Sequence, residues 1–209
     1  MSDLIQPLTE LERDALAELS NIAMARAATS LRQMVEHQVL LSVPQVDIVS
    51  KKRASEIIGS GQGAALVAVR QDFDGPFAGR ALLIFPEANS FELVRMVVGR
   101  ELSLQDVGSL EDEALAETGN IILNSWIATI ANLLKQSLKI SLPIVLRGNS
   151  ELMLKSTEQQ TLVLFLHIRF EVSMKEVQGY VALLMDIPSI EVLRVLLADL
   201  VVRLAGPQP

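Results

Sequence analysis

Apolar residues recur at helical spacing near the start of the chain. Residues three or four positions apart lie on one side of a helix. One such stripe consists of Leu16, Leu19, Ala23 and Ala27. Thr9 is followed three residues later by Glu12, a capping-box pattern, so the helix should begin there and run to about Val35.

The remainder of the first half shows β-type patterns separated by turn signals. Residues 39–50 are apolar and β-branched, but Pro44 lies inside them and cannot donate to a sheet ladder. We therefore predict an edge strand, a bulge or a break at that point. The other predicted elements are a helical turn at 55–58, strands at 64–69 and 77–85 joined by a turn at 74–76, and a helix at 86–99.

The segment 59–63 is rich in glycine. A phosphate-binding loop has to follow a strand and open a helix, whereas this segment leads into a predicted strand. We interpret it as a flexible connection and regard a nucleotide site there as a remote alternative.

The second half has the same kind of pattern after a polar connection at 100–109. Acidic and capping residues at 106–112 favour a helix start. The predicted elements are a helix running to about 137, a proline-containing strand at 139–146, strands at 161–172 and 177–185, and a helix at 188–204.

The order helix, strand, strand, strand, helix therefore occurs twice. Short segments also correspond: 79–84 with 179–184, and 91–95 with 190–194. This duplication predicts an α/β (α+β) fold in which two repeats, about 8–99 and 109–204, form one domain spanning 1–209. We expect a pseudo-two-fold axis, a shared sheet and the two long helices side by side.

The composition of the chain argues against several classes of function. The chain has 209 residues, 50% of them apolar, a net charge of −7 and no cysteine. An acidic surface disfavours nucleic acid, and the lack of cysteine excludes disulfides and thiolate metal sites and suits the cytoplasm. We expect no signal peptide, and the apolar run 121–134 is too short and too polar to insert in a membrane. His37 and His167 stand alone and should be ordinary structural residues.

Each long helix carries the same polar motif. An acidic residue is followed four positions later by glutamate and three positions after that by asparagine, which places all three on one helical face. The two copies are Asp14, Glu18 and Asn21, then Glu113, Glu117 and Asn120. A proline follows each asparagine by 23 positions, at Pro44 and Pro143, and the copies are 99 positions apart.

A solvated helix face is the usual explanation for one such triplet, and duplication could carry surface residues along passively. Asparagine, however, is a mediocre helix former, so two mid-helix copies at identical spacing favour a functional role. A carboxylate can pair with a partner's lysine, and an amide can orient water without titrating. These roles suit hydrolysis of a group carried by another macromolecule.

The spacing acid-x3-Glu-x2-Asn-x22-Pro resembles the signature of the CheC family of chemotaxis phosphatases, and the duplicated layout extends the resemblance over nearly the whole chain. That family more often has Asp or Ser where Glu113 stands, so we give this position little catalytic weight. Ala25 stands where the second half has Asn124, so the rims of the two sites differ.

The resemblance implies that the chain hydrolyses the aspartyl phosphate of a phosphorylated CheY-type response regulator. Glu18 and Glu117 would each reach the regulator's active-site lysine and hold the complex. Asn21 and Asn120 would each orient the attacking water in line with the phosphoryl group. Mg²⁺ would be held by the regulator, so we expect no cofactor or metal of this chain's own.

Other functions stay open. One is a non-catalytic binding or scaffold module of the flagellar-switch type, which would lack the Glu–Asn pair. Another is an adaptor for the receptor deamidase CheD, a partner of CheC proteins. Paired carboxylates of the glycosidase type are compatible with the sequence but would not explain the asparagines. We find no cysteine nucleophile and no serine in a nucleophile elbow.

Overall fold

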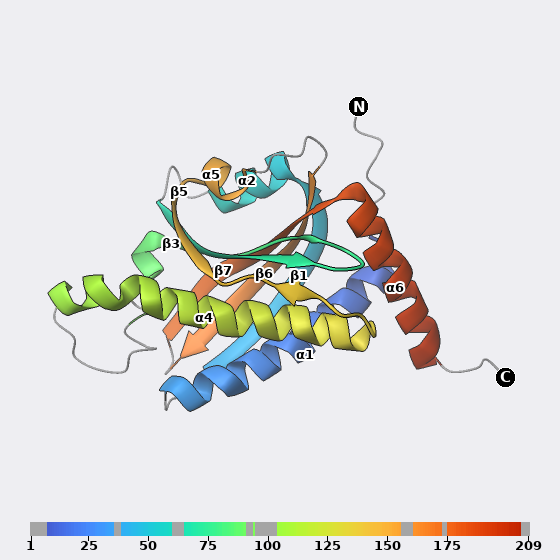
Figure 1. Ribbon diagram of the computed structural model, residues 1–209, viewed down its shortest axis with the longest axis horizontal. Coiled ribbons are helices and arrows are strands. Elements are labelled where there is room, and N and C mark those ends of the chain that lie inside the picture. Colours follow the sequence, from blue (N-terminus) through green and yellow to red (C-terminus); the bar gives the residue numbers. More distant parts are fainter. Residues whose placement is uncertain are drawn as a thin grey trace.

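The chain folds around one seven-stranded antiparallel sheet, flanked by helices on both faces (Figure 1). The computed structural model describes residues 8–35, 39–59, 65–90, 94, 104–155, 161–172 and 175–205. Its helices are α1 (Glu10–Val35), α2 (Lys51–Gly59), α4 (Leu104–Leu133), α5 (Ser150–Met153) and α6 (Ile187–Ala205). Its strands are β1 (Val39–Ser50), β2 (Leu66–Asp74), β3 (Gly79–Pro86), β4 (Lys139–Ile140), β5 (Ile144–Gly148), β6 (Thr161–Val172) and β7 (Lys175–Asp186).

The two halves exchange their first strands. The strand order is β1-β6-β7-β3-β2-β4, and β5 also pairs with β2. Hence β1 of the first half pairs with β6 of the second, while β4 and β5 of the second half pair with β2 of the first. The predicted shared sheet and repeated architecture are thus confirmed, and strands of both halves pair with each other within the sheet.

The pseudo-two-fold axis passes through the centre of the sheet, where β3 pairs with β7. Leu82 lies directly opposite Ala182, and these residues are equivalent when residue 79 is aligned with residue 179. The same alignment converts the pair Arg80–Leu184 into the pair Tyr180–Ile84. The register of the central strands therefore has the symmetry that the duplicated sequence predicted.

Alternating side chains of the strands build two apolar layers. In β2, Val67, Val69 and Phe73 face α1 and α4, whereas Leu66 and Ala68 face α2 and α5. Figure 1 shows α1 and α4 side by side across one face of the sheet, with α2 and α5 on the opposite face. The motif-bearing helices are therefore neighbours, as predicted.

Most elements match their predicted positions, and the differences have local causes. Helix α4 begins at Leu104, so the predicted polar connection at 100–109 was wrong for its helical part. The same helix ends at Leu133 because Lys135 adopts a left-handed conformation (φ 55°) and Gln136 N donates to Ala131 O at 2.8 Å. This is a Schellman ending without the usual glycine, so no sequence signal marked it.

Further outcomes concern strand β2, helix α5, the predicted helix at 86–99 and the glycine-rich segment. Strand β2 extends to Asp74 rather than ending at Val69, and the short helix α5, capped by Asn149, was not predicted. Residues 87–90 and 94 are helical, while the rest of the predicted helix at 86–99 lies outside the described residues. The glycine-rich segment follows a helix, α2, and precedes a strand, β2, which is the wrong order for a phosphate-binding loop.

The start of α1 is fixed by a capping box and by α6. Thr9 N donates to Glu12 Oε2 at 2.8 Å, and Glu12 N donates to Thr9 Oγ1 at 3.2 Å. Arg194 of α6 donates to both oxygens of Glu12 at 2.9 and 3.0 Å. Burial alone would raise the pKa of Glu12, but the hydrogen bonds from Arg194 and Thr9 outweigh it and hold the pKa below its ordinary value of 4.5.

Glu12→Gln should lower the free energy of unfolding by about 1–2 kcal/mol at pH 7, because it removes a bidentate charge-assisted pair that is mostly buried. The pKa of the Glu12 carboxyl is lower in the folded state than in the unfolded state. Its contribution to the free energy of unfolding is therefore complete above pH 4.5 and is lost as the pH falls through the folded-state pKa. Urea unfolding at pH 7 and pH 3 measures the difference. The control Asp199→Asn, in an exposed pair with Arg203, should cost under about 0.5 kcal/mol. An equal loss from Glu12→Gln at both pH values would contradict the assignment.

Candidate functional site

The two motif helices contact each other through polar groups as well as apolar ones. Trp126 Nε1 of α4 donates to Ser20 Oγ of α1 at 3.0 Å, and both residues are buried. Nearby, Arg26 Nη1 donates to Thr129 Oγ1 at 3.3 Å. These contacts join α1 to α4, so the two copies of the motif are carried on one pair of packed helices.

The glutamates and asparagines of the motif differ in exposure. Glu18 and Glu117 are exposed on their helices, where a macromolecule can reach them. Asn21 and Asn120 lie on the same faces but are half-buried. The glutamates are thus accessible to a partner, whereas each asparagine is accessible only in part, since its side chain is hydrogen-bonded to a neighbouring strand or to a cluster of side chains.

Asn21 is tied to β1 at an irregularity in that strand. Asn21 Oδ1 accepts a hydrogen bond from Val43 N at 2.9 Å. The β1–β6 register shifts between Ser42 and Gln45, so Val43 and Pro44 have no partner residues in β6. Proline lacks a backbone N–H and cannot donate here. Because of the register shift, the Val43 N–H donates to Asn21 instead of to β6. This geometry gives a physical reason for the spacing between the asparagine and the proline.

Asn120 is held by two side chains. Its Oδ1 accepts from Asn124 Nδ2 at 2.7 Å and from Gln71 Nε2 at 3.1 Å. Gln71 Nε2 also lies 2.9 Å from Ser141 O, which precedes Pro143 in the break between β4 and β5. The two asparagines therefore share one feature: the carboxamide oxygen is occupied by a protein donor. Within the described part of the chain, neither amide nitrogen has a hydrogen-bond partner.

Sequence reasoning missed Gln71. It lies on the helix-facing side of β2, between Val69 and Phe73, and is only 1% exposed. A glutamine in an otherwise apolar alternation is the signal that could have revealed it, since a buried polar residue needs a partner. The predicted strand ends at Val69, so its alternation does not reach this position.

Gly119 brings α4 close to β2. A Cβ atom there would lie 2.6 Å from Val69 Cγ2 and closer still to Val69 Cβ. The absence of a side chain thus allows the helix to approach the strand, and it places the adjacent Asn120 within reach of Gln71.

Gly119→Ala should destabilise the protein by about 1–3 kcal/mol, because the added methyl group overlaps Val69. Alanine is otherwise the better helix former by roughly 1 kcal/mol, so a clash is needed to explain a loss. Thermal unfolding followed by circular dichroism tests this. The second substitution Val69→Ala in the same chain should recover part of the loss. A higher melting temperature for Gly119→Ala alone would show that the helix is not tightly packed on β2.

The sequence is similar to those of known chemotaxis phosphatases. Residues 67–167, which include Gln71, Glu117 and Asn120, match the family described as "Chemotaxis phosphatase CheX". The CheY-P phosphatase CheC of Bacillus subtilis (strain 168) is 25% identical over 141 residues, which cover 66% of this chain and 67% of CheC. The chain is therefore similar to the chemotaxis phosphatases of the CheC/CheX/FliY superfamily.

Two FliY proteins are also similar to this chain, one in sequence and one in fold. The flagellar motor switch phosphatase FliY of Bacillus subtilis is 23% identical over 143 residues, 68% of this chain but only 37% of FliY. The crystal structure of FliY from Thermotoga maritima superposes with a TM-score of 0.73 at 18% identity, covering 92% of this chain and 98% of that one. At this identity the superposition establishes the fold only.

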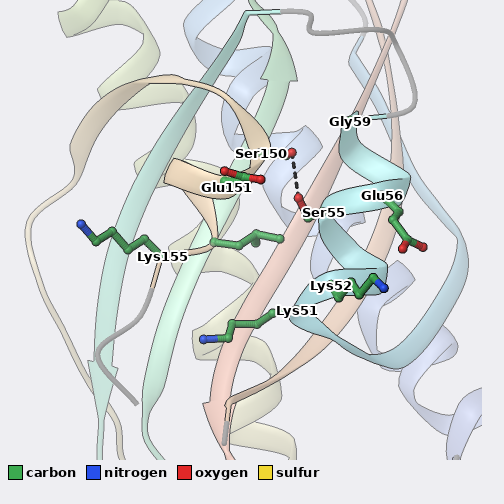
Figure 2. Close-up of a pocket in the computed structure, with 9 residues that line it drawn as sticks. Lys51, Lys52, Ser55, Glu56, Gly59, Ser150, Glu151 and Lys155 are labelled. Carbon is green, nitrogen blue, oxygen red and sulfur yellow. Dashed lines mark hydrogen bonds between the residues drawn. The ribbon is translucent and has the colours of Figure 1, made fainter. Parts of the chain in front are cut away.

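A cavity lies on the opposite face of the sheet from the CheC-like motif. It has a volume of about 720 Å³ and is lined by Lys51, Lys52, Ser55, Glu56, Gly59, Ser150, Glu151, Leu154 and Lys155. Figure 2 shows the Ser55 and Ser150 hydroxyls bonded to each other, at 2.8 Å, between α2 and α5. No motif residue lines this cavity, so it is separate from the two Glu–Asn motifs.

The described residues contain no group of three or more His, Asp or Glu side chains that could hold a metal ion. His167 packs against the rings of Phe165 and Tyr180, each with a centroid 5.2 Å away. Burial lowers the pKa of His167, which the Asp47 carboxylate partly opposes, so the imidazole acts as a neutral packing group. His37 lies outside the described residues. Among the described helices, none has the length and apolar character to cross a bilayer.

Proposed function

We propose that this chain hydrolyses the aspartyl phosphate of a CheY-type response regulator in chemotaxis signalling, at two sites centred on Asn21 and Asn120. The observation that supports this most directly is the state of the asparagines. In each one the carboxamide oxygen is held by a protein donor, and the amide N–H groups are left for a ligand.

Each site then has two functions. The exposed carboxylate of Glu18 or Glu117 pairs with the regulator's active-site lysine and orients the docked regulator. The amide nitrogen of Asn21 or Asn120 donates to the attacking water and fixes it in line with the bond that breaks. Water adds to phosphorus, the bond to the aspartyl oxygen breaks, and inorganic phosphate and a free carboxylate result.

Phosphoryl transfer asks mainly for such positioning, because its transition state is loose and little covalent chemistry falls to the protein. The Mg²⁺ that neutralises the phosphoryl oxygens belongs to the regulator. The name of the CheC relative, a CheY-P phosphatase, agrees with this substrate. Because response regulators of this type are cytoplasmic, we place the activity in the cytoplasm.

The decay of a phosphorylated CheY-type regulator, measured with and without this chain at one tenth of the regulator's concentration, tests the proposal. We expect faster decay and more than one phosphate released per chain. Decay at the regulator's own rate at every chain concentration would refute hydrolysis.

A second candidate follows from the FliY relative, which is a component of the flagellar motor switch as well as a phosphatase. In that case the chain would bind a regulator or a switch partner without hydrolysis, as an adaptor for CheD also would. Binding of the regulator with no acceleration of decay would favour these functions. The retained Glu–Asn pairs favour catalysis, since a scaffold has no need of a second oriented amide.

A further inference from the structure

The two sites differ in how each asparagine is held, and the duplication allows a comparison position by position. Val43 and Leu142 are equivalent, 99 positions apart. Val43 is 2% exposed and its N–H fixes Asn21. Leu142 is 85% exposed, because the second-half strand breaks between β4 and β5 where β1 is continuous. The backbone donor of the first site therefore has no counterpart at the second.

Side chains supply the missing donors at the second site. Asn124, which stands where the first half has Ala25, donates to Asn120 Oδ1 at 2.7 Å, and Gln71 Nε2 donates to the same oxygen at 3.1 Å. The side chain of Gln71 is further fixed by its contact with Ser141 O at 2.9 Å. Gln71 thus links the asparagine to the proline-containing segment, the connection that Val43 makes directly in the first site.

The burial of Gln71 also lowers the stability of the fold. Among the described residues, its Oε1 is the one buried side-chain oxygen or nitrogen without a hydrogen-bond partner. Burying an unsatisfied amide oxygen is unfavourable, and an apolar side chain of the same length would avoid that cost. A residue that lowers the stability of the fold but orients a neighbouring side chain is characteristic of a functional site.

We propose that Gln71 is a positioning residue for the Asn120 site alone. It fixes the Asn120 carboxamide so that its N–H groups face the docked phosphoryl group, while the Asn21 site depends on the backbone of Val43 instead. This inference rests on the proposed function, and it makes the two sites inequivalent: the second can be impaired by one buried side chain that never touches the regulator.

Gln71→Met tests this in two backgrounds, since methionine keeps the length and removes both polar atoms. In the Asn21→Ala chain, where only the second site acts, Gln71→Met should lower kcat roughly tenfold with little change in KM, because misorientation affects the reaction rather than docking. In the Asn120→Ala chain, where only the first site acts, it should leave kcat unchanged. The melting temperature should stay the same or rise, which a merely structural role would not allow.

A matched control comes from the equivalent rim position. Ala25→Asn adds to the first site the side chain that Asn124 provides at the second, and it should leave kcat unchanged because the Asn21 oxygen already has its donor. An unchanged kcat for Gln71→Met in the Asn21→Ala chain, or an equal fall in both backgrounds, would overturn the assignment.

A readout independent of activity separates this inference from the proposed function. The side-chain amide resonances of Asn120 in ¹⁵N-resolved NMR spectra should shift and broaden in Gln71→Met, while those of Asn21 should not. If the wild-type chain fails to accelerate dephosphorylation but Asn120 still responds to Gln71, the proposed function is wrong and the positioning stands. Asn120 resonances unaffected by Gln71→Met would refute the positioning itself.

Discussion

Replacing both asparagines by alanine should slow regulator dephosphorylation on the order of a hundredfold, because each site loses the polar group that orients the water. The two sites carry separate asparagines on separate helices, so Asn21→Ala alone should keep the activity of the Asn120 site, and Asn120→Ala that of the Asn21 site. Steady-state phosphate release from the wild type, the two single variants and the double variant measures this. The full fall in the rate of dephosphorylation should therefore appear only when both substitutions are combined.

The control for this experiment is Asn132→Ala. Asn132 is an exposed asparagine on α4 outside the motif, so its loss should not change the rate. A double variant of Asn21 and Asn120 that releases phosphate as fast as wild type would remove the asparagines from the chemistry and leave the scaffold function as the better explanation.

Glu18→Ala combined with Glu117→Ala should mainly raise KM, by about tenfold or more, while kcat falls less. Each substitution removes one side of a charge pair at an interface, and such a loss weakens the complex and leaves the partner's lysine unpaired. The wild-type KM should rise with ionic strength because salt screens this attraction, and the double variant should lose most of that dependence.

Glu151→Ala is the matched control, since Glu151 is exposed on the opposite face of the sheet. It removes the same charge from the chain without touching the motif, so it should leave KM near the wild-type value. A fall in kcat at unchanged KM for the Glu18 and Glu117 variant would show that the glutamates act in the reaction and not in docking.

Local patterns in the sequence predicted much of the fold. The stripe at Leu16 and Ala23 is buried as expected, and Thr9 and Glu12 form the predicted capping box. The duplicated order of elements predicted the shared sheet and the paired helices, because two related units bury their apolar faces most simply against each other. Pro44 correctly marked a bulge in an edge strand.

Long-range pairing and single special residues could not be predicted in this way. The exchange of first strands between the halves depends on contacts that are far apart in the sequence, such as Val39 with Val172 and Leu66 with Gly148, and no local pattern encodes them. The end of α4 depends on the left-handed backbone of Lys135, which lysine rarely adopts.

The site was predicted only in part, for a related reason. A repeated motif predicts Glu18, Asn21, Glu117 and Asn120 as candidate site residues, but the residues that hold the asparagines have no repeat to reveal them. Val43 acts through its backbone, so its side chain carries no signal, and Gln71 comes from a strand 49 positions before its partner. The structure was needed to show that the two copies of one motif are supported by different donors.

The most direct test of the two-site mechanism is a single-turnover measurement at saturating chain concentration. The phosphorylated regulator is mixed with enough wild-type chain, or enough of the Asn21→Ala and Asn120→Ala double variant, to bind all of it, and binding is confirmed separately for each. We predict that the wild-type complex loses its phosphoryl group much faster than the free regulator, while the double-variant complex forms but decays at about the free regulator's rate. Decay of the fully bound double variant at the wild-type rate would contradict the proposal that these asparagines position the attacking water.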